Sequence, residues 1–226
     1  MTAKFMAFVP WFLIMDLREK FFLQSVNPWL NWQGDNDAKF TSQYTDLFSI
    51  MQLLAIPCAT FSGGVISFGT WYYKKYHNLD PTKPSEMISI KRYCLSWLFL
   101  TIALLTTVWS WMASFKLKSA WWNNVIFFLC IFTRTNMYTI WNIWTLTEFP
   151  DNAFGRLSGV IVFILGIFSA SQQVMLRIAQ KQGWKEVQIC FAVAVMLVGL
   201  WKFWYYRRYA MRMHKRQFEK EGETQN

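Results

Sequence analysis

Residues 93–115 have the sequence YCLSWLFLTIALLTTVWSWMASF, a run of 23 residues without a charge. A helix of about 20 apolar residues is long enough to cross the hydrocarbon core of a bilayer, which is roughly 30 Å thick. Backbone groups in lipid must find their hydrogen-bond partners within the segment, and a helix provides them. This stretch therefore predicts a membrane-spanning helix.

Five further apolar blocks flank this one along the chain. The six predicted spans cover about residues 5–30, 44–72, 93–115, 121–146, 157–176 and 187–205. The alternating ten-residue strands of a membrane barrel are not seen, so we expect helices. The predicted fold class is an all-α membrane protein with six transmembrane helices. Residues 1–206 form the bundle in this prediction, and residues 207–226 form a basic, disordered cytoplasmic tail.

The composition supports the membrane class over a soluble one. Hydrophobic residues make up 54% and charged residues 16% of the 226-residue chain, whereas soluble domains carry about 25% charged residues. A net charge of +10 would suggest nucleic acid as the partner of a soluble protein. Here the basic residues lie mostly between and after the apolar blocks. We therefore expect membrane lipid, and no nucleic acid, as a partner.

The positions of Lys and Arg predict the orientation. An even number of spans places both termini on one side, and that side carries thirteen Lys and Arg residues against six on the opposite side. Cytoplasmic loops carry an excess of Lys and Arg. The sequence thus predicts a multi-pass integral membrane protein with cytoplasmic termini.

The reactive side chains argue against an enzyme. Cys58, Cys94, Cys130 and Cys190 lie within or at the edges of apolar blocks and form no CxxC pair, so we interpret them as small buried apolar residues. The two histidines lie 137 residues apart. We predict no catalytic residue, no metal site and no cofactor.

The first span carries four charged residues, which are costly in lipid. Asp16 and Lys20 are spaced i,i+4 and can pair on one helix face, whereas Arg18 points elsewhere and needs another partner or a cavity. Three interpretations stay open: a gate or substrate site, a structural ion pair, or an interfacial helix that does not cross. Asp16 or Glu19 could bind a proton, although nothing in the sequence demands coupling.

The fourth span carries Arg134 near its middle, and Tyr138 follows one turn later on the same face. A guanidinium at mid-membrane can bind a substrate carboxylate through two hydrogen bonds. It can equally neutralise an acid of the first span. Asn27-Pro28, near the far end of the first span, either lines a cavity or ends the helix.

Two groups of spaced motifs remain. The first comprises Leu17-Arg18-x-x-Phe21-Phe22, Asn27-Pro28-x-Leu30, Tyr44-Thr45-x-Leu47-Phe48 and Gln52. The second comprises Arg134-x-x-x-Tyr138 and Phe149-Pro150-x-x-x-Phe154-Gly155-x-Leu157-x-Gly159. Together they resemble the second half of the large neutral amino acid facilitators, which are sodium-independent, system L-type carriers of the major facilitator superfamily, and their protist relatives.

The resemblance implies that the six spans correspond to helices seven to twelve of a twelve-helix carrier. The chain would then be a half-carrier or fragment that moves large neutral amino acids by alternating access. A second six-helix half, on the same or a separate chain, is implied because such carriers hold the substrate between halves. The implied location is the plasma membrane or an internal, vacuolar-type membrane.

The resemblance also carries the candidate residues. The candidates for substrate binding or gating are Arg18, Asn27, Gln52, Arg134 and Tyr138. The candidates for intramembrane ion pairs, which follow from the charges of the first span and not from the resemblance, are Asp16, Glu19 and Lys20. One departure is Ser67, which stands four positions after Gly63 where the superfamily's loop motif has Asp, so the cytoplasmic latch that this Asp provides is weakened or missing.

Two alternatives differ in class from a carrier. The chain could be a non-transporting membrane protein that assembles with or regulates a full carrier, and a six-span partner or an upstream coding sequence would discriminate between the two. A membrane-embedded enzyme is the third hypothesis. It requires a converging acid, base or metal set, which the histidine-poor spans do not offer.

Overall fold

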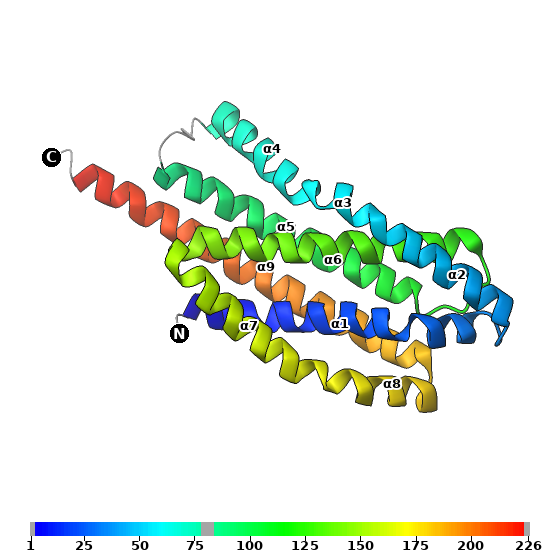
Figure 1. Ribbon diagram of the computed structural model, residues 1–226. Helices are drawn as coiled ribbons and strands as arrows, with labels where there is room; N and C mark the ends of the chain where they lie inside the picture. Colours follow the sequence, from blue (N-terminus) through cyan, green and yellow to red (C-terminus); the bar gives the residue numbers. More distant parts are fainter. Residues whose placement is uncertain (1–2, 78–83, 224–226) are drawn as a thin grey trace.

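A computed structural model describes residues 3–77 and 84–223, and every element in these two ranges is a helix. The elements are α1 (Ala3–Gln33), α2 (Ala38–Met51), η1 (Gln52–Leu54), α3 (Ala55–Cys58), α4 (Thr60–His77), α5 (Pro84–Met112), α6 (Ala120–Glu148), η2 (Asp151–Ala153), α7 (Phe154–Ser169), α8 (Ser171–Gln182) and α9 (Trp184–Glu223). The predicted all-α class is confirmed for these residues (Figure 1).

Within the described residues, four helical stretches are long and apolar enough to cross a membrane. They are Ala38–Lys75, Glu86–Met112, Phe154–Lys181 and Trp184–Arg212. The sequence predicts six spans. α1 and α6 have comparable lengths of 31 and 29 residues, but α1 has four charges within five positions and α6 has Arg134 among several Thr and Asn residues. The chain is thus compatible with a multi-pass membrane protein.

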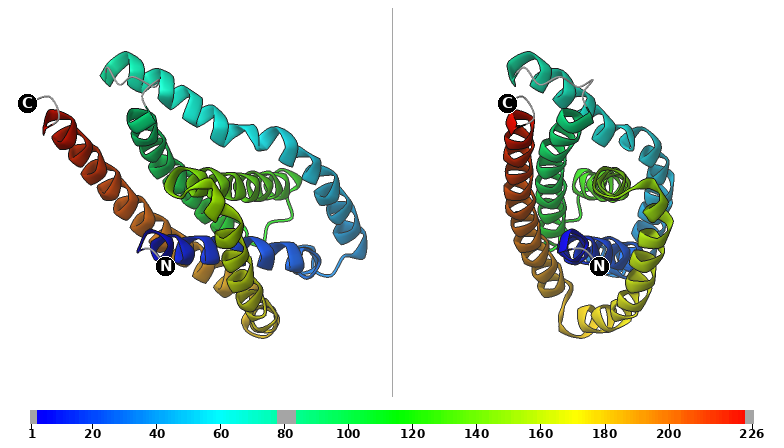
Figure 2. Two further views of the ribbon diagram at one scale, coloured as in Figure 1. Left: turned by 60° about the vertical axis from the view of Figure 1, so that its left-hand side comes forward. Right: turned by 90° about the vertical axis from the view of Figure 1, so that its left-hand side faces the viewer.

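α1 and α6 lie in the middle of the bundle. In Figure 2 they are flanked by α5 and α9 on one side and by two curved arms, α2–α4 and α7–α8, on the other. α1 packs against α2, α6, α7, α8 and α9. The polar residues of α1 and α6 therefore mostly face protein, where a hydrogen-bond partner can offset the cost of burial.

Both arms are bent for local reasons (Figure 1). Pro57 has no N–H for the carbonyl four residues earlier, and the helix tightens into the 3₁₀ turn Gln52–Leu54 just before it. In the second arm the α-helix is interrupted between α7 and α8. There the hydroxyls of Ser169 and Ser171 donate to the backbone carbonyls of Leu165 and Phe168, and such bonds bend helices.

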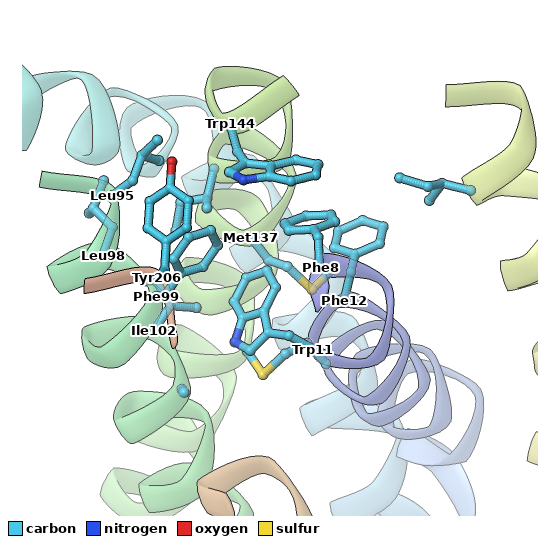
Figure 3. Close-up of a cluster of buried hydrophobic side chains, with 14 of the residues drawn as sticks. Phe8, Trp11, Phe12, Leu95, Leu98, Phe99, Ile102, Met137, Trp144 and Tyr206 are labelled. Atoms are coloured by element: carbon cyan, nitrogen blue, oxygen red, sulfur yellow. The ribbon is translucent and has the colours of Figure 1, made fainter. Parts of the chain in front are cut away.

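An aromatic core joins α1, α5, α6 and α9 (Figure 3). The Phe8 and Trp144 rings stack with centroids 3.9 Å apart, and Trp11 meets Phe99 edge-on at 4.8 Å. The Lys202 ammonium lies among four rings, 5.0–5.3 Å from their centroids. These contacts hold a buried cation by ring electrostatics.

The C-terminal segment differs from the sequence prediction. α9 continues as a helix to Glu223, through most of the segment 207–226 that is predicted to be a disordered tail. The physical reason is that residues 207–221 contain no Pro or Gly and include four Arg, two Lys, two Met and two Glu, which favour helix. Residues 224–226, and Lys83 from the orientation count, lie outside the described residues.

Candidate functional site

A hollow of about 400 Å³ lies between the first arm and α6. Its lining residues are Gln52, Ala55, Ile131, Arg134, Thr135, Tyr138, Thr139 and Asn142. Three of the sequence candidates, Gln52, Arg134 and Tyr138, therefore share one site. Small-molecule sites occupy roughly 300–1,000 Å³, so the hollow has the size of a small-ligand site.

The sequence places these side chains together through two local features. On α6 the lining residues recur every three or four positions from Ile131 to Asn142, and this spacing gathers them on one face of a helix. On the arm, Gln52 begins the 3₁₀ turn that precedes Pro57. The bend thus brings Gln52 and Ala55 against the polar face of α6.

Arg134 is the chemically distinctive residue of the hollow. Its side chain is half-buried and has no hydrogen-bond or ion-pair partner among the described residues. A guanidinium carries five N–H donors in a planar fork and binds carboxylates through two parallel bonds. The hollow therefore offers an unpaired cation to an anionic group of a ligand.

A charged pair adjoins this site. The Tyr138 hydroxyl donates to Asp16 Oδ1 at 2.7 Å, and Lys20 Nζ lies 2.8 Å from Asp16 Oδ2. Asp16 is buried, and the Lys20 side chain is 35% exposed. The structure thus brings Asp16 and Lys20 together and joins the pair to the hollow through Tyr138.

Arg18 does not reach the hollow. It is fully buried between α1, α5 and α9, where its Nε donates to Ser110 at 2.7 Å and one terminal nitrogen donates to Gln188. Its guanidinium lies 3.9 Å from the centroid of the Trp109 ring. Neutral dipoles and an aromatic face surround the cation, and the buried terminal nitrogen Nη1 has no hydrogen-bond partner among the described residues. Arg18 therefore has a packing role in this structure.

Two further candidates also lie apart from the hollow. Glu19 faces α6, where Thr133 and Cys130 donate to its two carboxylate oxygens at 2.7 and 3.3 Å. Asn27 is exposed, and its amide oxygen accepts from the Thr45 hydroxyl at 2.6 Å. α1 continues through the Asn27-Pro28 step to Gln33, so this step does not end the helix. Pro28 lines a separate hollow of about 360 Å³ rather than the one beside Arg134.

Sequence reasoning missed Asn136, which anchors the bent arm. Its amide oxygen accepts from the Ser62 hydroxyl at 2.7 Å, and its amide nitrogen donates to the Cys58 carbonyl at 3.1 Å. These bonds satisfy a carbonyl next to the Pro57 bend. The signal in the sequence that could have found this contact is a polar residue inside each of two apolar blocks, Ser62 in one and Asn136 in the other.

Sequence reasoning also missed Glu148, which ends α6. Its buried carboxylate accepts from Arg92 at 2.8 Å, from Lys4 at 2.9 Å, from Tyr206 at 2.7 Å and from Tyr209 at 3.2 Å. Burial by itself would raise the pKa of Glu148, but the hydrogen bonds from Arg92 and Lys4 lower it below the usual value. This carboxylate therefore joins α1, α5, α6 and α9 at one end of the bundle.

A second ion cluster closes the opposite end. Asp35, in the loop between α1 and α2, contacts Lys116 and also Lys118 at 2.8 Å, both in the loop between α5 and α6. Hydrogen bonds from the two lysines lower the pKa of Asp35 to about 2. Asp35 and both lysines are exposed, so this cluster is a surface link between loops.

Comparisons with family models, with curated proteins and with solved structures find no significant match to this chain. Over the residues that the structure describes, the fold and the site by themselves define a helical protein with four candidate membrane spans. Its central helix α6 presents an unpaired arginine to a ligand-sized hollow.

Proposed function

We propose that the chain is a six-helix half of a transmembrane carrier for large neutral amino acids, of the system L-type facilitator kind within the major facilitator superfamily. In this proposal α1 and α6 also cross the membrane, and both termini are cytoplasmic. The observation that carries the proposal is Arg134, a half-buried and unpaired cation in a hollow of about 400 Å³.

The hollow has the chemistry that a zwitterion with an apolar side chain requires. The Arg134 fork would bind the carboxylate. Gln52 and Asn142 offer amide groups for the ammonium, while Ile131 and Ala55 supply apolar surface. Binding sites commonly combine apolar walls with a few polar groups that orient the ligand.

The exposed faces of the two arms leave room for a second bundle. In the most apolar stretches of the two arms, 6% and 17% of the residues are buried, against 56% in α5. The hollow lies beside the first of these arms. A second six-helix half docked against this side would enclose the hollow, and rocking between the halves would expose it to each side of the membrane in turn.

Binding of L-leucine to the purified chain tests this function. We expect Arg134→Gln to weaken L-leucine binding about tenfold to a hundredfold, which is the range for loss of a charged hydrogen-bond partner. Leucine methyl ester lacks the carboxylate and should bind wild type and variant equally. Arg156→Gln is the matched control, because Arg156 is exposed and lies outside the hollow.

Equal loss of leucine and ester binding in Arg134→Gln would contradict a carboxylate contact. No leucine binding to wild type would reject the proposed substrate class. Uptake of radiolabelled leucine into liposomes, with and without a candidate partner half, then separates a carrier half from a non-transporting relative that regulates a full carrier.

A further inference from the structure

Tyr138 joins the hollow to a buried acid of α1. Its side chain lines the hollow together with Arg134, and its hydroxyl donates to Asp16 Oδ1 at 2.7 Å. Asp16 is 2% exposed, and its second carboxylate oxygen lies 2.8 Å from the Lys20 ammonium. A chain of contacts therefore runs from the hollow through Tyr138 and Asp16 to Lys20.

The bond to Asp16 determines what Tyr138 can offer to a ligand. A phenol has one proton to donate, and its oxygen can also accept. Because Tyr138 donates its proton to Asp16, its oxygen can only accept from a further partner. Within the part of the chain that the structure describes, no other hydrogen bond involves this oxygen. The oxygen is thus available to a donor on a ligand in the hollow.

The Tyr138 side chain is fixed before any ligand binds. Phe12 meets its ring edge-on with the centroids 5.8 Å apart, and the Trp141 ring lies at 6.4 Å. Asp16 holds the hydroxyl, and Lys20 holds Asp16. A contact made by a preorganised group loses less conformational entropy on binding.

Arg134 and Tyr138 offer opposite contacts to one small molecule. They lie four residues apart on α6, a rise of about 6 Å along the helix. Arg134 can only donate, whereas the committed Tyr138 oxygen can only accept. The amides of Gln52 and Asn142 can do both, so they do not by themselves select a cationic group. The carboxylate and ammonium of an amino acid share one carbon atom, and such a zwitterion can contact both residues.

We propose that Tyr138 binds the ammonium group of the ligand, with Asp16 as the positioning residue that keeps the Tyr138 oxygen free to accept. The inference rests on the proposed function, because it takes an amino acid as the ligand of the hollow. Tyr138 then sets the substrate class: α-amino acids bind, and carboxylates without an amino group bind weakly. The negative charge of Asp16 adds to this preference, because charges are less screened in a protein interior than in water.

Binding of three ligands to the purified chain tests the proposal. L-leucine carries both ions, isocaproate is leucine without its amino group, and leucine methyl ester keeps only the ammonium. Tyr138→Phe keeps the ring and should weaken binding of leucine and of the ester about tenfold to a hundredfold, the range for loss of a hydrogen bond to a charged group. Isocaproate should bind this variant and wild type equally. Arg134→Gln should give the reverse pattern, with loss of isocaproate binding and unchanged binding of the ester.

Two further variants sharpen the test. Tyr44→Phe makes the same chemical change on α2, outside the hollow, where the Tyr44 ring packs against Phe40. It should behave like wild type. Asp16→Asn gives Tyr138 a weaker, neutral acceptor, so it should lower the ratio of leucine affinity to isocaproate affinity. A purely structural role of Asp16 would lower both affinities and leave their ratio unchanged.

Equal losses of leucine and isocaproate binding in Tyr138→Phe would overturn the ammonium contact, as would unchanged leucine binding. Equal affinity of wild type for leucine and isocaproate would also overturn it. Each of these results leaves the proposed function standing, because leucine binds. Absence of leucine binding to wild type would instead reject the proposed function and, with it, this inference. The wild-type comparison requires no variant, so a Tyr138→Phe protein that fails to fold does not remove the test.

Discussion

Arg18 and Arg134 lie on the two central helices, yet their surroundings give them different roles. Arg18 has Ser110, Gln188 and the face of Trp109 as partners. Its Nη1 has no hydrogen-bond partner, but the side chain is fully buried and does not line the hollow. Arg134 has no such partner among the described residues and borders the hollow. A carboxylate therefore gains more binding free energy at Arg134, where it replaces solvent molecules and breaks no existing hydrogen bond of the protein.

At the residue scale, Asp35 gives a prediction about pH. Because its pKa is lowered to about 2 by Lys116 and Lys118, the stabilisation from this link is present above the ordinary Asp pKa of about 3.9. It is lost as the pH falls through about 2. A carbon-13 titration of the Asp35 carboxyl group checks this value.

The matched variant for that titration is Lys116→Gln combined with Lys118→Gln. It removes both cations and keeps both loops in place. The pKa of Asp35 should then return to the ordinary range. A titration unchanged from wild type would mean that the two lysines do not hold Asp35 in solution.

At the scale of elements, Gly199 of α9 lies directly against Ala103 of α5. A Cβ added at Gly199 would collide with the Cβ of Ala103. We predict that Gly199→Ala lowers stability by about 1–3 kcal/mol, the usual cost of overpacking. Thermal unfolding in detergent measures the loss.

Two further variants sharpen this prediction. Ala103→Gly in the Gly199→Ala background removes the colliding atom and should recover most of the loss. Gly166→Ala is the control, because a Cβ there meets nothing within 4 Å. If Gly166→Ala destabilised the protein as much as Gly199→Ala, loss of glycine rather than the collision would be the cause.

The same element shows what the sequence could and could not predict. Apolar blocks located the long helices of the described residues, because a helix that crosses a bilayer needs about 20 mostly apolar residues. They did not locate the α5–α9 contact. Gly155 and Gly159 have the GxxxG spacing typical of helix contacts, yet a Cβ at either position meets nothing within 4 Å. Gly199, which lacks that spacing, makes the close contact.

At the scale of the whole molecule, the candidate site was predictable only where its residues lie on the same helix. The helical period places Arg134 and Tyr138 on one face, so their proximity follows from the sequence. Gln52 joins them because the arm bends near Pro57, and this depends on tertiary packing through Asn136. The partner of Arg18 was not predictable, because Ser110 and Gln188 lie 92 and 170 residues away along the chain.

Glu148 supplies the prediction that concerns the whole bundle. Glu148→Gln removes the charge that four helices share and leaves Arg92, whose side chain is 7% exposed, without its carboxylate. Removal of one partner of a buried ion pair costs about 3–5 kcal/mol. We therefore expect a lower thermal midpoint in detergent, while Glu186→Gln at the surface should leave the midpoint unchanged.

A double variant distinguishes this network from simple loss of packing. Arg92→Gln combined with Glu148→Gln leaves two neutral amides that can bond to each other, so the double variant should be more stable than the sum of the single losses predicts. Strict additivity would mean that Arg92 and Glu148 do not interact in solution. The bundle end would then be held by the aromatic core around Phe8 and Trp144 (Figure 3), whose stacking does not depend on charge.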